Sequence, residues 1–547
     1  MNNSIASEKT NEIYRRVDPE FKHRLQEFYS GDTLRFCYQC GACTANCSLS
    51  KLLNVYKPNK VLEHSKLGIW DTPQSGAFFL CSACMQCTRG CPQGVRVHEL
   101  IHALKELAIS DRTARDYLIN EFEAALAMLS EEMPFPISYG WISLSPSGEG
   151  DIDGEGDIDV EGEADSEDGG EGEADGEGEG KGAKTFNALA RGILRRSLKH
   201  LVTLNTPLQQ SDVSAGNDAA TSSAATTSNA AATGRVAVIG SGAAGLTTAW
   251  ELCKAGIPVT VFEPMPEPGG MLMVGIPSYR LPKDVVAAEI ENIKAQGVEI
   301  IVNTPVDRDL FNKTVSGGEF EAVFIATGAP ANRGLRIEGE NLEGVVPALE
   351  FLRKFNLGEQ IDVGKNVVVI GGGNVGIDVA RTALRCGAET VQLFCLESRN
   401  EMPSHEWEIL EAAREGVVIS PSWGPKAISG DGTAVSEVKL IHCASVFGAN
   451  GRFAPVFDEN KTQTIAADMV ITAIGQAPNL DFLGRMVDTE RGAISVDPRT
   501  LETNLPGVFA GGDTVSGTAS LIEAILAGKT AAASIIGYLE EKSKKDE

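Results

Sequence analysis

Long hydrophobic runs are missing from this sequence of 547 residues. No uninterrupted apolar stretch approaches the roughly 20 residues that a membrane-spanning helix needs. The first residues, MNNSIASEKTNEIYRRV, also lack the apolar core of a signal peptide. These two absences predict a soluble protein with no transmembrane segment. The clustered cysteines described below favour metal binding in a reducing compartment and therefore predict the cytoplasm.

An excess of positive charge is also missing. Lysine and arginine number 48 against 75 aspartates and glutamates, so the formal net charge is −27. Such a balance argues against nucleic acid as a partner because its phosphates would be repelled. Sixteen of the acidic residues lie between Glu149 and Glu179, so the rest of the chain is only mildly acidic.

Disulfide-forming pairs are not expected, although the chain has twelve cysteines. Eight of them form two groups with the spacing C-x2-C-x2-C-x3-C: Cys37, Cys40, Cys43, Cys47, then Cys81, Cys84, Cys87, Cys91. This spacing is typical of [4Fe-4S] ligands, and in two-cluster ferredoxins the fourth cysteine of each group binds the other cluster. The prediction is one cluster on Cys37, Cys40, Cys43 and Cys91, and another on Cys47, Cys81, Cys84 and Cys87. Structural zinc is the alternative, but it usually takes two pairs a dozen or more residues apart.

The segments around these cysteines have helical periodicity, as in HELIHALKELAI, and predict a helical ferredoxin domain over residues 1–145. Two stretches, CYQCGACTANC and GIWDTPQSGAFFLCSACMQCTRGCPQGVRVHELI, resemble the C subunit of heterodisulfide reductase over roughly residues 30–130. The resemblance implies that the clusters carry electrons between a flavoprotein and a catalytic iron-sulfur subunit.

Residues 146–233 are predicted to be linkers that flank one basic helix. The Gly/Asp/Glu tract from Ser147 to Lys184 contains no aromatic residue, and it predicts a disordered tether because it cannot bury apolar surface. A calcium-binding loop is the alternative, but the twelve-residue EF-hand pattern is incomplete. A basic helix is expected near 184–202, and an Ala/Ser/Thr-rich linker follows it.

The stretch from Arg235 to Glu263 predicts a dinucleotide-binding unit. An apolar strand leads into Gly240-Ser241-Gly242-Ala243-Ala244-Gly245, the G-x-G-x-x-G pattern, and a helix and a second strand follow. The pyrophosphate is expected at the N-terminus of that helix. Glu263, about 20 residues downstream, is expected to accept hydrogen bonds from the adenosine ribose.

A second unit of the same kind begins at Asn366. The strand to Ile370 precedes Gly371-Gly372-Gly373-Asn374-Val375-Gly376, and a further strand leaves the sheet at Glu397. Glu397 is expected to accept hydrogen bonds from a ribose with free hydroxyls and to repel a 2′-phosphate, so NADH is predicted over NADPH. Arg399 lies close enough in sequence to neutralise such a phosphate in part.

The C-terminal half resembles the glutamate synthase small subunit and other two-dinucleotide-binding flavoproteins. The residues that carry the resemblance are PGGML, GIPSYRLPKD, ATGAP, GGGNVGID, EMPSHEWE and AGGD. It implies an FAD-binding domain over 234–330 and 476–547 and an NAD-binding domain over 331–475. It places FAD on Gly240, Gly242, Ala244, Gly245, Glu263, Gly270, Met271, Thr327, Gly328, Gly512 and Asp513. It places the nicotinamide nucleotide on Gly371, Gly373, Asn374, Val375, Gly376, Glu397 and Arg399. This half has no C-x-x-C, which disfavours a thioredoxin reductase.

Together these features predict a multidomain protein, an α-helical ferredoxin-like domain joined by disordered linkers to an α/β Rossmann-type flavoprotein. The predicted function is an iron-sulfur flavoprotein oxidoreductase in which NADH reduces FAD and electrons pass through two [4Fe-4S] clusters to or from a partner. A complex of the heterodisulfide reductase kind is the expected partner. A glutamate-synthase-like small subunit and an electron-wiring scaffold with vestigial nucleotide sites are the alternatives. No catalytic acid or base is expected, because hydride passes between stacked rings.

Overall fold

The computed structural model describes residues 25, 32–53, 56–67, 77–81, 84–110, 115–144, 192, 194, 234–430, 432–448 and 451–546. The chain divides into two units. The first contains Met1–Ala231 with the short segments Ala287–Gln296 and Ser520–Leu526, and the second contains the rest. The predicted acidic tether, the basic helix near 184–202 and the linker after it lie outside the described residues, except for Gly192 and Leu194.

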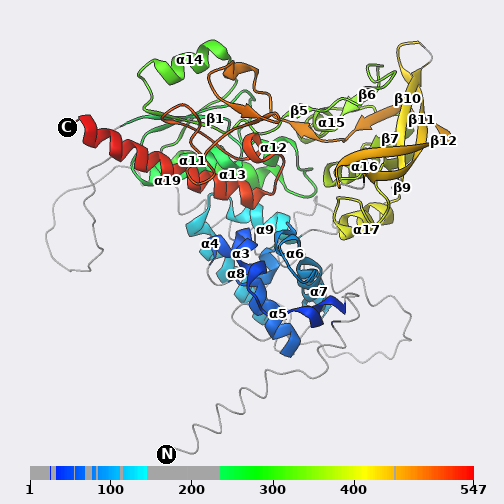
Figure 1. The fold of residues 1–547 in the computed structure, drawn as a ribbon, viewed down its shortest axis with the longest axis horizontal. Helices are drawn as coiled ribbons and strands as arrows, with labels where there is room; N and C mark the ends of the chain where they lie inside the picture. The colour runs from blue at the N-terminus through cyan, green and yellow to red at the C-terminus, as the bar shows by residue number, and fades with distance from the viewer. Residues whose placement is uncertain are drawn as a thin grey trace, which may run out of the picture. The chain divides into compact units, whose positions relative to one another are not determined.

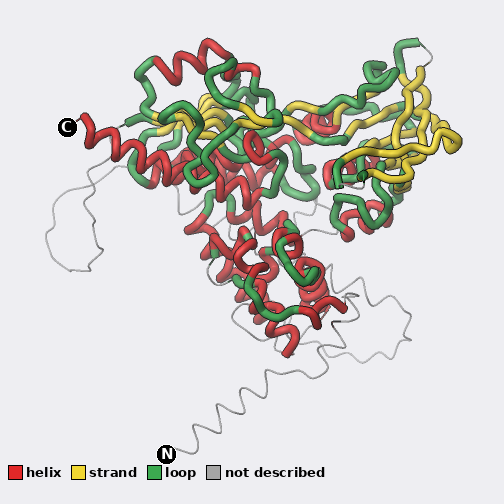
Figure 2. Tube along the Cα trace, in the orientation of Figure 1, coloured by secondary structure: helices red, strands yellow, loops and turns green. Residues whose placement is uncertain are grey.

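The described part of the first unit is helical, as predicted (Figures 1 and 2). Its helices are, in chain order, η1 (Asp32–Phe36), α3 (Ala42–Asn46), α4 (Ser48–Leu52), α5 (Pro58–Leu67), η2 (Ala77–Leu80), α6 (Gln86–Arg89), α7 (Val97–Ser110), α8 (Arg115–Glu132) and α9 (Pro136–Leu144). Aromatic side chains form much of its core. Phe79 meets Phe122 edge to face, with ring centroids 6.1 Å apart.

A buried carboxylate caps α9 inside this unit. The side chain of Glu289, on the segment Ala287–Gln296, accepts hydrogen bonds from the backbone N–H groups of Ile137 (2.7 Å) and Ser138 (3.2 Å). The Ser138 hydroxyl also donates to it. Glu289 thus satisfies N–H groups in the first turn of α9 that have no partner within the helix.

The second unit contains two five-stranded parallel sheets, drawn among the yellow segments of Figure 2. The first sheet has the order β17-β4-β1-β2-β3, formed by β1 (Val236–Ile239), β2 (Val259–Phe262), β3 (Glu299–Ile301), β4 (Ala322–Ile325) and β17 (Val508–Ala510). The helices that follow its strands along the chain are α11 (Ala243–Lys254), α12 (Met271–Val274), α13 (Lys283–Ala295), α14 (Arg308–Ser316), α18 (Asp513–Ser516) and α19 (Leu521–Asp546). Most of α13 and the first turns of α19 belong to the segments of the first unit named above. All four residues of β1 are buried, as expected of a parallel strand covered on both faces.

The second sheet has the order β6-β13-β7-β8-β9 and repeats the same plan. Its strands are β6 (Val345–Pro347), β7 (Asn366–Ile370), β8 (Thr390–Cys395), β9 (Val418–Pro421) and β13 (Met469–Thr472), and its helices are α15 (Ala348–Asn356), α16 (Asn374–Arg385) and α17 (Glu406–Arg414). In the first sheet the chain passes outward from β1 through β2 and β3 and returns on the other side of β1, and in the second it passes outward from β7 through β8 and β9 and returns on the other side of β7. Ligands of such folds bind where this direction reverses.

An antiparallel sheet that the sequence analysis does not predict packs beside the second parallel sheet. It consists of β10 (Trp423–Gly430), β11 (Val435–Phe447) and β12 (Phe453–Ala466). Val438 and Leu440 on β11 bury their side chains in one cluster with Val368 and Phe394 of the parallel sheet. The short pairs β5 (Ala331–Asn332) with β14 (Gln476–Ala477) and β15 (Thr489–Glu490) with β16 (Ala493–Ile494) complete the strands, and η3 (Asp481–Leu483) lies between β14 and β15.

Within the described residues, one helix is long and apolar enough by composition to cross a membrane, the stretch Leu521–Lys545 of α19. This helix makes polar contacts with the first parallel sheet's helix α11. Lys529 pairs with Glu251 at 3.2 Å, and the hydroxyl of Thr248 donates to the carbonyl of Gly528 at 3.1 Å. Core helices of soluble proteins pass the same test of length and composition, and 33% of the apolar window of this helix is buried inside the protein. The absence of a transmembrane segment stays a prediction.

Candidate functional site

The turn between β1 and α11 has the geometry of a phosphate-binding loop. Gly240 has φ +104°, and a Cβ there would lie 2.4 Å from the carbonyl oxygen of Ala326. Gly245 packs the helix onto the turn, since its Cβ would lie 2.0 Å from the Gly240 carbonyl. At Gly242, the residue before α11, a Cβ would meet nothing within 4 Å. The turn is therefore closed on its inner side and open where a pyrophosphate would approach the helix N-terminus.

Glu263 lies at the end of β2, as predicted, but its carboxylate already has partners in the chain. It is 5% exposed and accepts hydrogen bonds from the Ser241 backbone N–H at 2.9 Å and from the Ser241 hydroxyl. Its other oxygen accepts from the Met265 N–H at 2.9 Å. Glu263 thus ties the glycine turn to the end of β2, in addition to the ribose contact expected of it.

The other residues predicted for FAD gather at the carboxyl ends of neighbouring strands. Thr327 follows β4 and lies 3.3 Å from the hydroxyl of Thr514, which is in α18 with Asp513. A Cβ on Gly270 would lie 2.8 Å from the Cα of Gly242. The structure therefore brings the first glycine turn together with Ala244, Gly270, Met271, Thr327, Gly328, Gly512 and Asp513 at one edge of the first sheet.

The second glycine turn repeats the first. Gly371 has φ +129°, and a Cβ there would lie 2.3 Å from the Ala473 carbonyl oxygen. Gly376 lies against the Gly371 carbonyl, whereas Gly373 meets only Pro403 at 4.0 Å. Asn374 begins α16, and its side-chain oxygen accepts from the His405 N–H at 3.2 Å. Val375, also predicted for the nucleotide, lies in the first turn of this helix.

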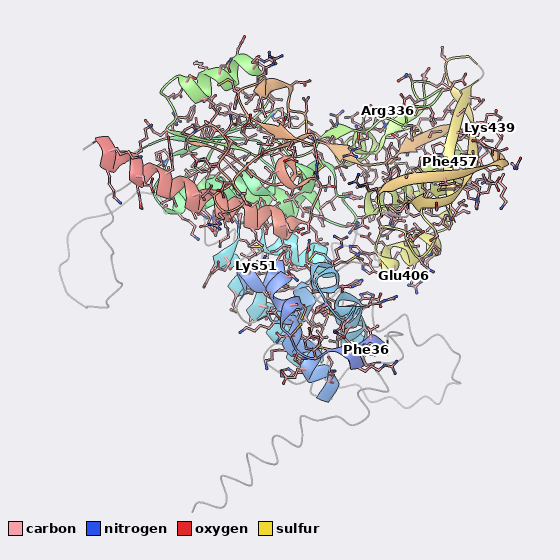
Figure 3. The ribbon with its side chains drawn as sticks, viewed as in Figure 1. Phe36, Lys51, Arg336, Glu406, Lys439 and Phe457 are labelled. Atoms are coloured by element: carbon pink, nitrogen blue, oxygen red, sulfur yellow. The ribbon has the colours of Figure 1, made fainter. Side chains whose placement is uncertain are left out.

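Glu397 and Arg399 follow β8, where the adenosine ribose is expected. The guanidinium of Arg399 pairs with both carboxylate oxygens of Glu406, at 2.8 and 2.6 Å. Glu406 begins α17 and is labelled in Figure 3. The Glu397 carbonyl accepts from the Ser422 N–H at 2.8 Å, which fixes the backbone of this loop. Arg399 therefore already has a carboxylate partner in the structure, that of Glu406.

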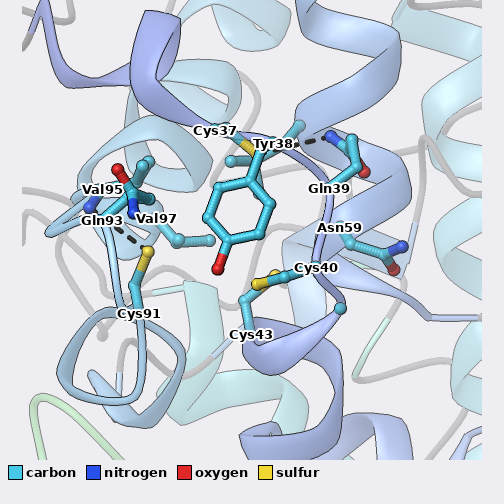
Figure 4. Close-up of a pocket in the computed structure, with 12 residues that line it drawn as sticks. Cys37, Tyr38, Gln39, Cys40, Cys43, Asn59, Cys91, Gln93, Val95 and Val97 are labelled. Carbon is cyan, nitrogen blue, oxygen red and sulfur yellow. Dashed lines mark hydrogen bonds between the residues drawn. The ribbon is translucent and has the colours of Figure 1, made fainter.

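The first set of predicted cluster ligands lines one pocket (Figure 4). Cys37, Cys40 and Cys43 come from the first motif, and Cys91 comes from the second. The sulfur of Cys37 accepts from the Gln39 amide at 3.5 Å, and the sulfur of Cys91 accepts from the Val95 N–H at 3.4 Å. The structure therefore brings the fourth cysteine of the second motif to the first three cysteines of the first motif, and the exchange of ligands between two clusters stays a prediction.

The second set lies together in the same unit. Cys47, Cys81, Cys84 and Cys87 are near enough for their charges to interact, and Cys47 and Cys87 are buried. Burial raises the pKa of the Cys84 thiol to about 11 and that of Cys87 further. Lysines bind the carbonyls of the first cysteine in each motif, Lys66 on Cys37 at 2.6 Å and Lys105 on Cys81 at 2.8 Å.

Both sets suit a cubane cluster. Each has four thiols, one for each iron of such a cluster, and iron bound there would displace the thiol protons. Among the residues that the structure describes, no three His, Cys, Asp or Glu side chains converge on a single ion. In a four-iron cluster each of the four thiols would bind a different iron, and each donor set supplies four thiols.

Sequence reasoning missed a buried charge cluster between the two parallel sheets. Arg280, in the PSYRLPK segment, contacts Asp378 of α16 at 2.6 Å and Glu408 of α17 at 2.9 Å. These partners lie 98 and 128 residues away, so no local pattern reveals them. Lys283 nearby donates to the carbonyl of Leu272 at 2.9 Å, and burial lowers its pKa to about 7.

Comparisons with known proteins give matches for both the cysteine region and the flavoprotein region of the chain. Residues 33–95 match the 4Fe-4S dicluster domain, and residues 234–528 match the pyridine nucleotide-disulphide oxidoreductase family. The chain is 45% identical over 312 residues to the NADP(+)-dependent formate dehydrogenase subunit beta of Moorella thermoacetica, covering 56% of this chain and 44% of that one. It is 38% identical over 321 residues to the putative glutamate synthase [NADPH] small chain of Cereibacter sphaeroides, covering 56% and 76%.

A third relative, the NADPH-Fe(3+) oxidoreductase subunit beta of Geobacter sulfurreducens, is 35% identical over 334 residues, which are 56% of this chain and 50% of that one. The chain thus spans half or less of two of these three relatives. Among solved structures, FprA from Mycobacterium tuberculosis covers 57% of this chain and 86% of its own at 19% identity, with a TM-score of 0.48.

The fold and the sites define an iron-sulfur flavoprotein oxidoreductase with a nicotinamide nucleotide unit. The chain belongs to the pyridine nucleotide-disulphide oxidoreductase family. The resemblance to the glutamate synthase small subunit is confirmed, and so is the prediction of a helical domain with a flavoprotein of Rossmann type. The more specific resemblance to the heterodisulfide reductase subunit stays a prediction.

Proposed function

We propose that this chain takes hydride from NADH and passes the electrons, one at a time, to a partner protein. FAD is the group that can accept two electrons and release them singly. The proposal rests on one observation: two glycine turns that are open where a pyrophosphate would lie share a chain with two sets of four thiols. The first turn, with Glu263 and Asp513, would hold FAD. The second turn would hold the nicotinamide nucleotide, and the two thiol sets would hold [4Fe-4S] clusters.

The chain's own groups supply binding and orientation. The backbone N–H groups at the starts of α11 and α16 face the open sides of their turns and would hold the two pyrophosphates. Cys37, Cys40, Cys43 and Cys91 would bind one cluster, and Cys47, Cys81, Cys84 and Cys87 the other. No acid or base is needed, because hydride moves directly between the two rings.

The acceptor is proposed to be a separate subunit. The relatives from Moorella and Geobacter are named as beta subunits, and the Cereibacter relative as a small chain, so each name implies further subunits. The resemblance of the cysteine region to the C subunit of heterodisulfide reductase supports a partner with a catalytic iron-sulfur site. The relative named as a glutamate synthase small chain supports the alternative, delivery of electrons to a separate synthase subunit. Purification of the tagged protein from its native cell, with identification of the proteins bound to it, separates these two.

NADH is proposed as the preferred nucleotide, on the basis of Glu397. A carboxylate there would repel the 2′-phosphate of NADPH, and Arg399, which could offset this, is paired with Glu406. The names of all three relatives contain NADP or NADPH, so the point requires a direct test. Because exposed ion pairs contribute only about 0–1 kcal/mol, the Arg399 pair could open for NADPH at small cost.

The test compares the catalytic efficiency of dye reduction with NADH and NADPH. Wild type should favour NADH. Glu397→Arg should move the ratio at least about tenfold toward NADPH, equal to ~1.4 kcal/mol. Glu406→Gln should move it the same way by less, because it frees Arg399. Glu359→Arg, an equal charge change on an exposed residue of the same domain, should leave the ratio unchanged. Higher efficiency of the wild type with NADPH would refute the NADH assignment and leave the flavoprotein assignment standing.

A further inference from the structure

Tyr56 lies in the loop between α4 and α5, beside the second thiol set. Its side chain is 1% exposed, and the charges that act on its phenol come from Cys81, Cys47 and Cys87. The phenol is near enough to Cys81 to interact with its sulfur. Among the described residues, however, the phenol oxygen has no partner at hydrogen-bonding geometry.

A buried hydroxyl without a partner is unusual in proteins, because such a group gives up its hydrogen bonds to water when the chain folds. The phenol lies beside the second thiol set, since Cys81, Cys47 and Cys87 are the cysteines whose charges act on it. Sulfur atoms of an iron-sulfur cluster accept hydrogen bonds, so a cluster bound by this set would provide the missing partner.

The two thiol sets differ in this respect. At the first set, Cys40 is exposed, and Gln39 and the Val95 N–H donate to cysteine sulfurs. At the second set, the hydroxyl and backbone N–H of Ser50 and the backbone N–H of Leu49 act on Cys47, and the Thr88 hydroxyl acts on Cys87. Each set also has one lysine that donates to the carbonyl of the first cysteine of its motif, Lys66 to Cys37 and Lys105 to Cys81, so lysine charge does not distinguish the two sets. Tyr56 is therefore a buried side-chain donor at the second set in addition to this shared framework.

We propose that Tyr56 donates a hydrogen bond to a sulfur of the cluster held by Cys47, Cys81, Cys84 and Cys87, and thereby raises the reduction potential of that cluster. The inference rests on the proposed cluster assignment. Reduction adds one electron, supplied by the nicotinamide nucleotide through FAD, and the added negative charge strengthens the hydrogen bond. No proton leaves Tyr56, because burial raises the pKa of its phenol well above the usual value. Tyr56 is a positioning residue that biases which of the two clusters holds the electron.

The test is an anaerobic redox titration of the full chain, followed by electron paramagnetic resonance. Tyr56→Phe removes only the hydroxyl. Iron and sulfide content should be unchanged, and one cluster should become about tenfold harder to reduce, equal to ~59 mV for one electron. The other cluster should not move. Tyr38→Phe is the matched control, because the Tyr38 phenol lies beside the first set but is 59% exposed to water, which can replace it. It should leave the second cluster unchanged.

Assignment to the second set comes from Cys84→Ala, which should lose that cluster. In this background Tyr56→Phe should no longer shift any potential. If Tyr56→Phe alone loses iron, wild-type protein labelled with 3-fluorotyrosine replaces it as the test, since a more acidic phenol is a stronger donor and should raise the potential of the second cluster. Unchanged potentials in a fully loaded Tyr56→Phe protein, or in the fluorinated one, would overturn the inference. Absence of iron and sulfide from the wild type would instead refute the proposed function.

Discussion

Removal of Arg280 should destabilise the flavoprotein unit, because two buried carboxylates depend on it. Its guanidinium contacts both oxygens of Asp378, at 2.6 and 2.8 Å, and one oxygen of Glu408 at 2.9 Å. The side chains are 15%, 11% and 1% exposed in the order Arg280, Asp378, Glu408. The second oxygen of Glu408 has no partner among the described residues. Arg280→Met therefore leaves the buried Glu408 carboxylate without the cation that contacts it.

The magnitude follows from burial. Breaking a buried ion pair by removing one partner costs about 3–5 kcal/mol, and the partial exposure of Arg280 and Asp378 favours the lower end, about 3 kcal/mol. The pH dependence has a definite sign. Burial raises the pKa of Glu408 above its unfolded value, and Arg280 opposes that shift. Without Arg280 the folded pKa rises further, so Glu408 binds a proton more tightly in the folded state.

Glu408 therefore lowers the free energy of unfolding. This loss grows as the pH rises from the pKa of Glu408 in the unfolded state to its pKa in the folded state. In Arg280→Met the folded-state pKa of Glu408 is higher, so the loss continues to grow up to a higher pH. At its full extent the loss is larger by ~1.36 kcal/mol for each unit by which that pKa increases. The difference between wild type and variant should be smaller at pH 6 than at pH 8.

The assay is urea unfolding at pH 6 and pH 8, with circular dichroism and flavin fluorescence as independent probes. Arg399→Met is the matched control: its pair with Glu406 is 39% and 63% exposed, so it should cost at most about 1 kcal/mol. Equal losses for Arg280→Met and Arg399→Met, or a difference that shrinks with rising pH, would refute the reasoning.

Three further changes have defined outcomes. Gly240→Ala should abolish FAD retention in the purified protein, because its Cβ would lie 2.4 Å from a carbonyl oxygen in a backbone with φ +104°; a fully flavinated variant would contradict this. Gly371→Ala should keep FAD but lose reduction by NADH, and normal reduction would count against the second turn as the nucleotide site. Burial raises the pKa of Glu289 to about 8, so the contribution of Glu289 to the free energy of unfolding of the wild type should fall as the pH rises from 4.5 to 8. Glu289→Gln should therefore lose less relative to wild type at pH 9 than at pH 5, and a pH-independent difference in unfolding midpoint would exclude the effect.

Local sequence patterns predict the parts of this protein whose geometry is local. The glycine turns follow from short-range sterics, since Gly240 and Gly371 both adopt a positive φ and lie against a neighbouring carbonyl. The grouping of Cys91 with the first motif also follows, because the reach of the fourth cysteine is a property of its spacing.

The remaining features depend on contacts between distant segments. Asp378 lies 98 residues from Arg280, and Glu289 lies 151 from Ser138, so neither pair has a local signature. Tyr56 lies outside both cysteine motifs, so their spacing does not predict that its phenol lies beside the second set. The antiparallel sheet of β10 to β12 is a further example, since alternation alone does not say where its strands pack.

The most direct test of the central claim is an anaerobic titration of the full chain with NADH, followed by optical absorbance and electron paramagnetic resonance. The account predicts that the wild type takes up about four electrons, two at FAD and one at each cluster. Cys84→Ala should take up about three, with flavin reduction unchanged. Bleaching of the flavin without reduction of either cluster, or zinc in place of iron and sulfide on metal analysis, would contradict the account.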